Sequence, residues 1–234
     1  HLHLSGLHCH IGSQILDTEG FVAAAEIMMQ FYAKIKNELG VELHDLNLGG
    51  GFGIQYTEQD DPLPYEAYME AVAKVINRCS QELQVKRPFI LIEPGRSIVA
   101  PAGITLYTVG GKKEIPNIRT YLSIDGGMCD NPRYILYQSE YDALIANKAD
   151  QPKTATVTIA GKCCESGDLI GENMPIQEAE PGDILAVCAT GAYNYSMASN
   201  YNRLQKPAVV FVKNGTSRLV VKRESLEDLV RNDI

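Results

Sequence analysis

Residues 47–53 read NLGGGFG, and their three consecutive glycines directly follow an apolar run, Val41 to Leu48, that has the character of a β-strand. Three consecutive glycines let the main chain turn tightly and direct successive N–H groups at an anion such as phosphate. The segment is not a dinucleotide fingerprint, because GxGxxG starting at Gly49 would need a glycine where Ile54 stands. It also lacks the Lys-Ser/Thr ending of a P-loop. A flexible turn with only a packing role stays an alternative.

Strands and helices alternate on both sides of this glycine turn. The apolar run 2–11 precedes a helical pattern from Phe21 to Leu39, and a second helical pattern, Tyr65 to Leu83, precedes the apolar run 88–93. This order is typical of a parallel α/β sheet. A complete (β/α)₈ barrel needs about 250 residues, so residues 1–105 are predicted to be the last three βα units of such a barrel.

The remaining residues, 106–234, are predicted to form a separate β domain. Short apolar segments recur between turn residues there, which is typical of all-β structure. They are Ile104 to Val109, Ile118 to Ile124, Thr154 to Ala160, Ile184 to Cys188 and Ala208 to Val212. A short terminal helix, Ser225 to Arg231, is expected with Ser225 as its N-cap. The predicted fold class is therefore α/β plus all-β, with the C-terminal domain a β-barrel or sandwich.

Composition excludes several classes of protein. The 234 residues are 45% hydrophobic and 21% charged, which predicts a folded globular protein. A formal net charge of −8 without a basic run argues against nucleic acid as a partner, and no apolar stretch approaches the roughly 20 residues of a membrane helix. Six cysteines without CxxC pairs favour a reducing cytoplasm. The chain starts in strand-like alternation, so we expect it to begin inside a fold, with His1 and His3 as packing or surface residues.

Polar side chains follow the other two predicted strands of the α/β half. His8, His10 and Ser13 come after the first strand, and Glu93 and Arg96 come at the end of the third. Barrel active sites are built at these carboxyl ends, so we expect the three strand ends to meet. Two alternatives stay open, a buried Glu93–Arg96 ion pair and a metal held by His8 and His10. We expect no metal, because only one further histidine follows.

The second half carries a thiol beside a carboxylate, in the loop 161–168, where Cys164 precedes Glu165. Such a thiol can transfer a proton, although most cysteines are buried and inert. Two other loops, 130–137 and 191–199, are rich in polar and small residues. Each of these loops alone is weak evidence for a site.

Taken together and in order, these segments resemble the fold-type III, pyridoxal-phosphate-dependent amino acid decarboxylases. The motifs are GLHCHIGSQ at 6–14, NLGGGFG at 47–53, EPGRSIVAPAG at 93–103, DGGMCDNPR at 125–133, CESGD at 164–168 and GAYNYSMASNYN at 191–202. The resemblance implies a barrel that carries pyridoxal 5'-phosphate, a C-terminal β domain, and a cytoplasmic homodimer with active sites at the subunit interface. The motifs look most like the branch that decarboxylates meso-2,6-diaminopimelate to L-lysine.

The resemblance also implies a role for each candidate residue. His10 would stack on the pyridine ring, and Glu93 would pair with the ring nitrogen, which favours electron withdrawal as CO₂ leaves. Cys164, delivered from the partner subunit, would protonate the carbanion. The phosphate would be held by Ser13, Gly49, Gly50, Gly51, Gly95, Arg96 and Tyr193. The substrate would be bound by Arg96, Arg133, Tyr137, Glu165 and Tyr193.

One family feature has no counterpart in the sequence. The family anchors its cofactor as a Schiff base on a lysine near the end of the first barrel strand, and no lysine here occupies that position; Lys162 lies in the β domain. The chain therefore looks like the C-terminal portion of such an enzyme and is expected to be inactive alone. Two alternatives remain: a fold-type III decarboxylase acting on a carboxylated polyamine, ornithine or arginine, and a non-catalytic homologue that binds pyridoxal phosphate.

Overall fold

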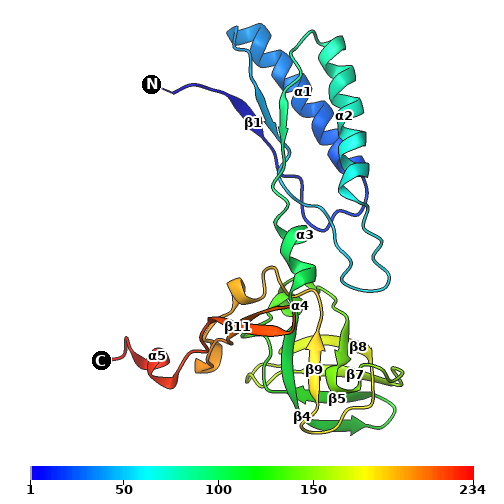
Figure 1. Ribbon diagram of the computed structural model, residues 1–234, viewed down its shortest axis with the longest axis vertical. Helices are drawn as coiled ribbons and strands as arrows, with labels where there is room; N and C mark the ends of the chain where they lie inside the picture. Colours follow the sequence, from blue (N-terminus) through cyan, green and yellow to red (C-terminus); the bar gives the residue numbers. More distant parts are fainter. Residues whose placement is uncertain (1) are drawn as a thin grey trace. The chain divides into compact units, whose positions relative to one another are not determined.

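The computed structural model describes residues 2–234 and divides at Ala100 into two compact units (Figure 1). The second unit is Pro101–Ile234. The division lies close to the change of pattern in the sequence near residue 105. His1 lies outside the described residues, so its expected packing role is not addressed. None of the helices that the structure describes has the length and apolar character needed to span a membrane.

The first unit is built on a three-stranded parallel sheet. Its strands are β1 (Gly6–His8), β2 (Asp45–Asn47) and β3 (Phe89–Leu91), in the order β1-β2-β3. Each is shorter than the apolar run that predicted it, and β1 and β2 begin four residues later than those runs. Figure 1 shows both long helices on the same side of this sheet. On the uncovered side Phe89 is 76% exposed.

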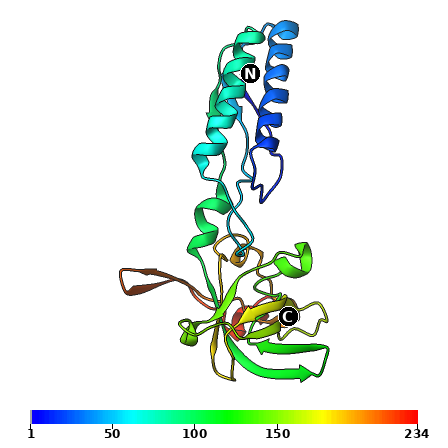
Figure 2. The same cartoon turned by 90° about the vertical axis from the view of Figure 1, so that its right-hand side faces the viewer.

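The helices α1 (Glu19–Leu39) and α2 (Tyr65–Glu82) lie side by side, as Figure 2 shows. Gly40 adopts φ 67° and its N–H donates to Lys36 O, which ends α1 at the predicted stop. The buried ring of Phe21 stacks on Phe52 with centroids 4.8 Å apart, and Tyr68 meets both rings edge-on. Phe52 follows the glycine turn, so this aromatic cluster anchors the turn to the core.

The second unit is organised around a six-stranded sheet in the order β6-β9-β4-β5-β7-β8. The strands are β4 (Thr105–Ile115), β5 (Arg119–Ile124), β6 (Ala143–Ile145), β7 (Ala155–Ala160), β8 (Leu169–Ile176) and β9 (Ile184–Val187). The long strand β4 pairs with β9 through its first residues and with β5 through its last. The two edge strands lie beside each other, and the Ile145 N–H donates to Gln177 Oε1 at 2.8 Å next to them. The sheet is therefore nearly closed.

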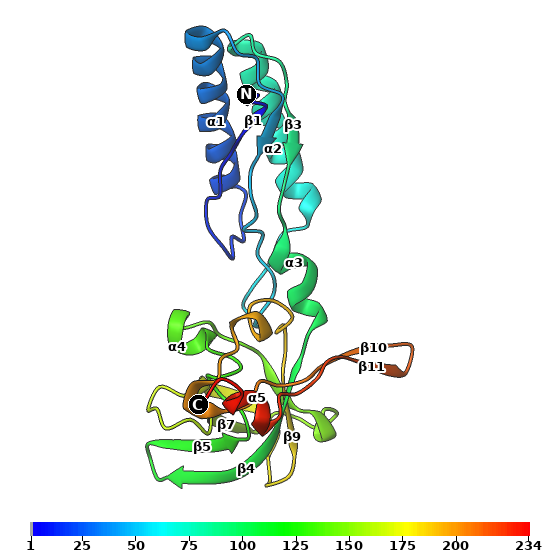
Figure 3. The same ribbon diagram turned by 90° about the vertical axis from the view of Figure 1, so that its left-hand side faces the viewer.

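The rest of the second unit consists of short elements. They are the helices α4 (Arg133–Tyr137) and α5 (Leu226–Val230), the 3₁₀ turns η2 (Ala146–Lys148), η3 (Tyr195–Met197) and η4 (Tyr201–Arg203), and the hairpin of β10 (Val209–Lys213) and β11 (Thr216–Val221), seen in Figure 3. Ser225 caps α5 in a capping box with Asp228, which confirms the predicted N-cap. Residues 133–137 were expected as a loop and are helical. The helix α3 (Gly95–Val99) and the turn η1 (Ala100–Ala102) join the units.

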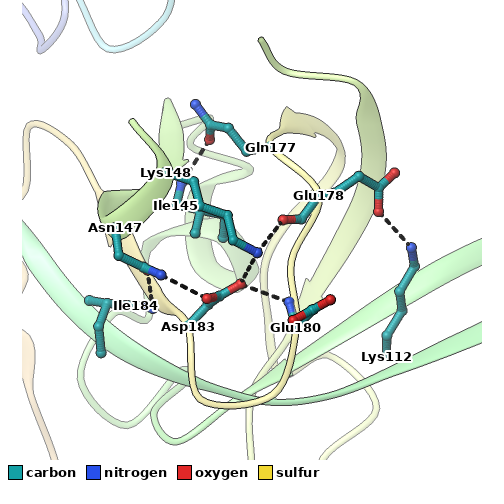
Figure 4. Close-up of polar contacts among 9 residues, drawn as sticks. All are labelled: Lys112, Ile145, Asn147, Lys148, Gln177, Glu178, Glu180, Asp183 and Ile184. Carbon is teal, nitrogen blue, oxygen red and sulfur yellow. Dashed lines mark hydrogen bonds and ion pairs between the residues drawn. The ribbon is translucent and has the colours of Figure 1, made fainter. Parts of the chain in front are cut away.

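A polar cluster ties the turn before β9 to η2 (Figure 4). Asp183 accepts from Lys148 Nζ and Asn147 Nδ2, both at 2.7 Å, and from the Glu180 N–H at 2.8 Å. These donors, the lysine first, lower the pKa of Asp183 to about 2. The carboxylate thus joins these two chain segments at one end of the sheet.

Candidate active site

The glycine turn after β2 packs directly on the ends of the neighbouring strands. A Cβ at Gly49 would lie 2.6 Å from Cys9 O, and one at Gly50 would lie 2.4 Å from Glu93 O. A Cβ at Gly51, whose φ is 105°, would lie 2.7 Å from Gly12 O. Each of the three positions therefore requires glycine for close approach of main chains. The turn brings the ends of β1, β2 and β3 together.

Two of the three glycine N–H groups in this turn donate to protein atoms, whereas the sequence led us to expect all three to face an anion. The Gly49 N–H donates to Asn47 Oδ1 at 2.8 Å, and the Gly50 N–H donates to His10 Nδ1 at 3.2 Å. Within the described part of the chain no hydrogen bond uses the Gly51 N–H. The main-chain anion donor available in the turn is therefore Gly51, and Gly50 instead fixes the ring of His10.

Glu93, at the end of β3, is contacted by two side chains from neighbouring strands. Asn47 Nδ2 donates to its Oε1 at 2.8 Å, and His8 Nε2 lies 3.5 Å from its Oε2. The side chain of Glu93 is 56% exposed. The alternative of a buried Glu93–Arg96 ion pair is therefore wrong: the carboxylate is open to a ligand and its partners are His8 and Asn47. Asn47 was not singled out, although it stands in the NLGGGFG motif.

Arg96 lies in α3 and is buried, with a different set of partners. Its Nη2 donates to Ser13 Oγ at 2.5 Å, and its Nη1 bonds to Tyr56 Oη. Because the Ser13 oxygen accepts from the guanidinium, its own O–H can donate to an anion. A Cβ at Gly95 would meet no atom within 4 Å, so the main chain there borders open space. Tyr56 was missed, because nothing in its sequence context marks it.

His8 and His10 have separate partners, which are Glu93 and Gly50. Across residues 2–234 no group of three or more His, Cys, Asp or Glu side chains is placed to hold a metal ion. The first unit thus brings together His10, Ser13, the glycine turn, Glu93 and Arg96 at the carboxyl ends of its strands.

In the second unit, the guanidinium of Arg133 lies over two aromatic rings. Its guanidinium carbon is 5.3 Å from the ring centroid of Tyr137 and 5.2 Å from that of Tyr193. Arg133 is only 8% exposed, and among the described residues no carboxylate forms an ion pair with it. Its Nη2 donates to Ser139 Oγ at 3.3 Å. A buried cation without a carboxylate favours binding of an anionic ligand.

The two adjacent cysteines of the second unit differ in environment. Cys164 is exposed, whereas the Cys163 thiol lies within hydrogen-bonding reach of Cys129. Burial, followed by the carboxylate of Asp130, raises the pKa of Cys129 to about 12. Glu165 Oε2 accepts from the Tyr201 hydroxyl at 3.4 Å. Of these thiols, Cys164 is the exposed one.

Several known proteins resemble this chain in sequence. Residues 1–100 match the family described as pyridoxal-dependent decarboxylase, pyridoxal binding domain. The whole chain is 51% identical over 234 residues to a diaminopimelate decarboxylase of Bacillus subtilis, of which it covers 53%. The chain is a relative of the diaminopimelate decarboxylases. It spans about half the length of these relatives: for the Bacillus methanolicus protein the identity is 52% over 221 residues, which is 94% of this chain and 51% of that protein.

Solved structures of diaminopimelate decarboxylases share the fold. The M. jannaschii protein in co-complex with L-lysine has a TM-score of 0.90 and 35% identity, with 98% of this chain and 52% of that chain covered. The Helicobacter pylori protein complexed with L-lysine has a TM-score of 0.84 and 32% identity, with 97% and 54% covered. The fold of both units is therefore that of fold-type III decarboxylases.

Proposed function

We propose that the protein serves in the pyridoxal-phosphate-dependent decarboxylation of meso-2,6-diaminopimelate to L-lysine. The observation that carries the proposal is the meeting of His10, the glycine turn and Glu93 at the carboxyl edge of a parallel sheet. The names of the relatives give the substrate. Because the chain spans about half of them, the proposal concerns the whole enzyme, and residues 1–234 alone are expected to be inactive.

The finer architecture belongs to the same proposal. We infer that the first unit is the last part of a (β/α)₈ barrel, because a parallel sheet is normally covered on both faces and Phe89 is exposed on the uncovered one. The nearly closed sheet of the second unit supports a C-terminal β-barrel. A cytoplasmic homodimer with shared active sites completes the inferred assembly.

The residues of the first unit fit pyridoxal phosphate. The Gly51 N–H, the Ser13 hydroxyl and the Arg96 guanidinium are the donors for the phosphate, and the open main chain at Gly95 adds room. When bound, the cofactor supplies an electron sink for the pair released as CO₂ leaves. The carboxylate of Glu93, oriented by Asn47 and lying near His8, would pair with the ring nitrogen and keep it protonated, and the His10 ring, fixed by Gly50, would stack on the pyridine ring.

The residues of the second unit fit a substrate with an amino acid group at each end. Arg133, whose guanidinium lies over the rings of Tyr137 and Tyr193, binds a carboxylate, and Glu165 binds the distal ammonium. Tyr193 also contributes to phosphate binding. Cys164 Sγ holds the proton that is delivered to the reacting carbon, a role that an exposed thiol suits.

Incubation of the whole enzyme and the cofactor with meso-2,6-diaminopimelate tests the proposal. We expect CO₂ and L-lysine in equal amounts and much slower turnover of ornithine, arginine and a carboxylated polyamine. Faster turnover of one of those three compounds would identify it as the substrate in place of meso-2,6-diaminopimelate. Cofactor binding without turnover of any of the four would favour the non-catalytic homologue.

A further inference from the structure

The loop that carries Cys164, residues 161–168, meets two other segments of the second unit. They are the loop 125–133, which leads to Arg133, and the segment 199–202. The Ser199 N–H donates to Cys129 O at 2.8 Å, and the Lys162 N–H donates to Gly126 O at 2.9 Å. Main-chain bonds thus join the three segments, and two side chains complete the junction.

The first of these side chains is Asp168, which lies on the buried side of the loop and is 2% exposed. Its Oδ1 accepts the Met128 N–H at 2.5 Å, and its Oδ2 accepts the Cys163 N–H at 2.6 Å. Each carboxylate oxygen therefore holds a different loop. An added Cβ at Gly127 or Gly161 would lie 2.3 or 2.2 Å from these oxygens, so the two glycines enclose the carboxylate closely.

The second side chain is Asn202, on the exposed side of the same loop. Its Oδ1 accepts the N–H of Cys164 at 2.7 Å. Asn202 has φ 54°, a left-handed conformation that asparagine and glycine tolerate best. The main chain of the Cys163–Cys164 pair is consequently held from two directions, by Asp168 at one residue and by Asn202 at the next.

We propose that Asp168 and Asn202 are positioning residues that fix the loop carrying Cys164, Asp168 from its buried side and Asn202 from its exposed side. The inference rests on the proposed function, in which the Cys164 thiol delivers the proton. Neither residue is assigned a contact with substrate or cofactor. Both residues determine the position of the Cys164 thiol. Asp168 also determines the distance between this loop and the loop that leads to Arg133.

The two substitutions that test the inference are chosen to preserve shape. Asp168→Asn keeps the volume but turns an NH₂ group toward one of two N–H donors, so one anchor is lost. In Asn202→Gly, the glycine tolerates the left-handed conformation, and only the side-chain oxygen that accepts the Cys164 N–H is lost. A displacement of about 1 Å in a reacting group can cost roughly 10²-fold in rate. We expect kcat of the whole enzyme to fall about 10²-fold in Asp168→Asn and about 10-fold in Asn202→Gly.

The KM for meso-2,6-diaminopimelate should change less than kcat in both variants, because Arg133 and Glu165 remain present to bind the substrate. Amide hydrogen exchange gives a second readout: Met128 or Cys163 should exchange faster in Asp168→Asn, and Cys164 in Asn202→Gly. Asp183→Asn is the matched control, since it is the same substitution in the same unit, away from the loop. It should lower the unfolding temperature and leave kcat unchanged.

The inference is overturned if both variants keep kcat within twofold, if these amides keep wild-type exchange rates, or if Asp183→Asn loses as much kcat at an equal loss of thermal stability. If the wild-type enzyme does not decarboxylate any of the four substrates, the proposed function fails by itself. The exchange measurements then still decide whether the two side chains anchor the loop.

Discussion

At the residue scale, Arg133 shows how the surroundings of one side chain define its ligand. Its guanidinium carbon lies over the rings of Tyr137 and Tyr193, and its Nη2 donates to the neutral hydroxyl of Ser139. Stacking on aromatic faces is a property of arginine that lysine does not share. The two rings suit a planar cation. The negative charge that pairs with Arg133 is therefore expected to come from a carboxylate on the ligand.

Arg133→Met should therefore weaken substrate binding selectively. Methionine keeps an apolar side chain between the two rings but removes the charge, and a charge-assisted hydrogen bond contributes about 1.5–3 kcal/mol. We expect KM for meso-2,6-diaminopimelate to rise by about 10-fold to 100-fold, measured by steady-state kinetics. Arg133→Lys, which keeps the charge without the stacking, should recover only part of the loss. An unchanged KM in Arg133→Met would show that the carboxylate binds elsewhere.

At the element scale, the glycine turn sets the spacing of β1, β2 and β3. Gly50→Ala would place a Cβ 2.4 Å from Glu93 O, so the ends of β2 and β3 would have to separate. Overpacking of this kind costs about 1–3 kcal/mol, and we expect a lower unfolding temperature together with weaker pyridoxal phosphate binding. Gly95→Ala is the control for stability, because its Cβ would meet nothing within 4 Å. Equal stability of the two variants would contradict the close packing.

Asp183 gives the second unit a pH dependence whose sign follows from its lowered pKa. An unfolded aspartate has a pKa of about 3.9, whereas the donors around Asp183 lower its pKa to about 2. The stabilisation is therefore complete above about pH 4 and is lost as pH falls toward 2. Thermal unfolding of wild type and Asp183→Asn should differ most near neutral pH and converge near pH 2. A difference that stays constant over this range would contradict the assignment.

At the scale of the whole molecule, the sequence predicted what depends on regular periodicity and on motifs. The helices α1 and α2 follow from their long apolar faces, and the stop at Gly40 and the cap at Ser225 follow from local chemistry. Strand β8 was missed, because Glu172 and Asn173 interrupt its alternation.

The candidate site was predictable only in part, for a related reason. The motifs placed Glu93 and Arg96 at a strand end but could not assign their partners. Tyr56 and Ser13 reach Arg96 across 40 and 83 residues of sequence, and Asp168 reaches Met128 across 40. Pairings over such distances arise from tertiary structure and leave no pattern in a single sequence.

The inferred homodimer can be tested by mixing two inactive variants of the whole enzyme. Glu93→Gln removes the carboxylate of the first unit, and Cys164→Ala removes the proton donor that the partner subunit is expected to supply. If sites are shared in a symmetric dimer, a mixed dimer contains one site with both native residues, so co-unfolded and refolded equal mixtures should regain about a quarter of wild-type activity. Mixing without subunit exchange is the control and should restore nothing. Absence of any recovery, with mixed dimers demonstrated by mass spectrometry, would show that each subunit completes its own site.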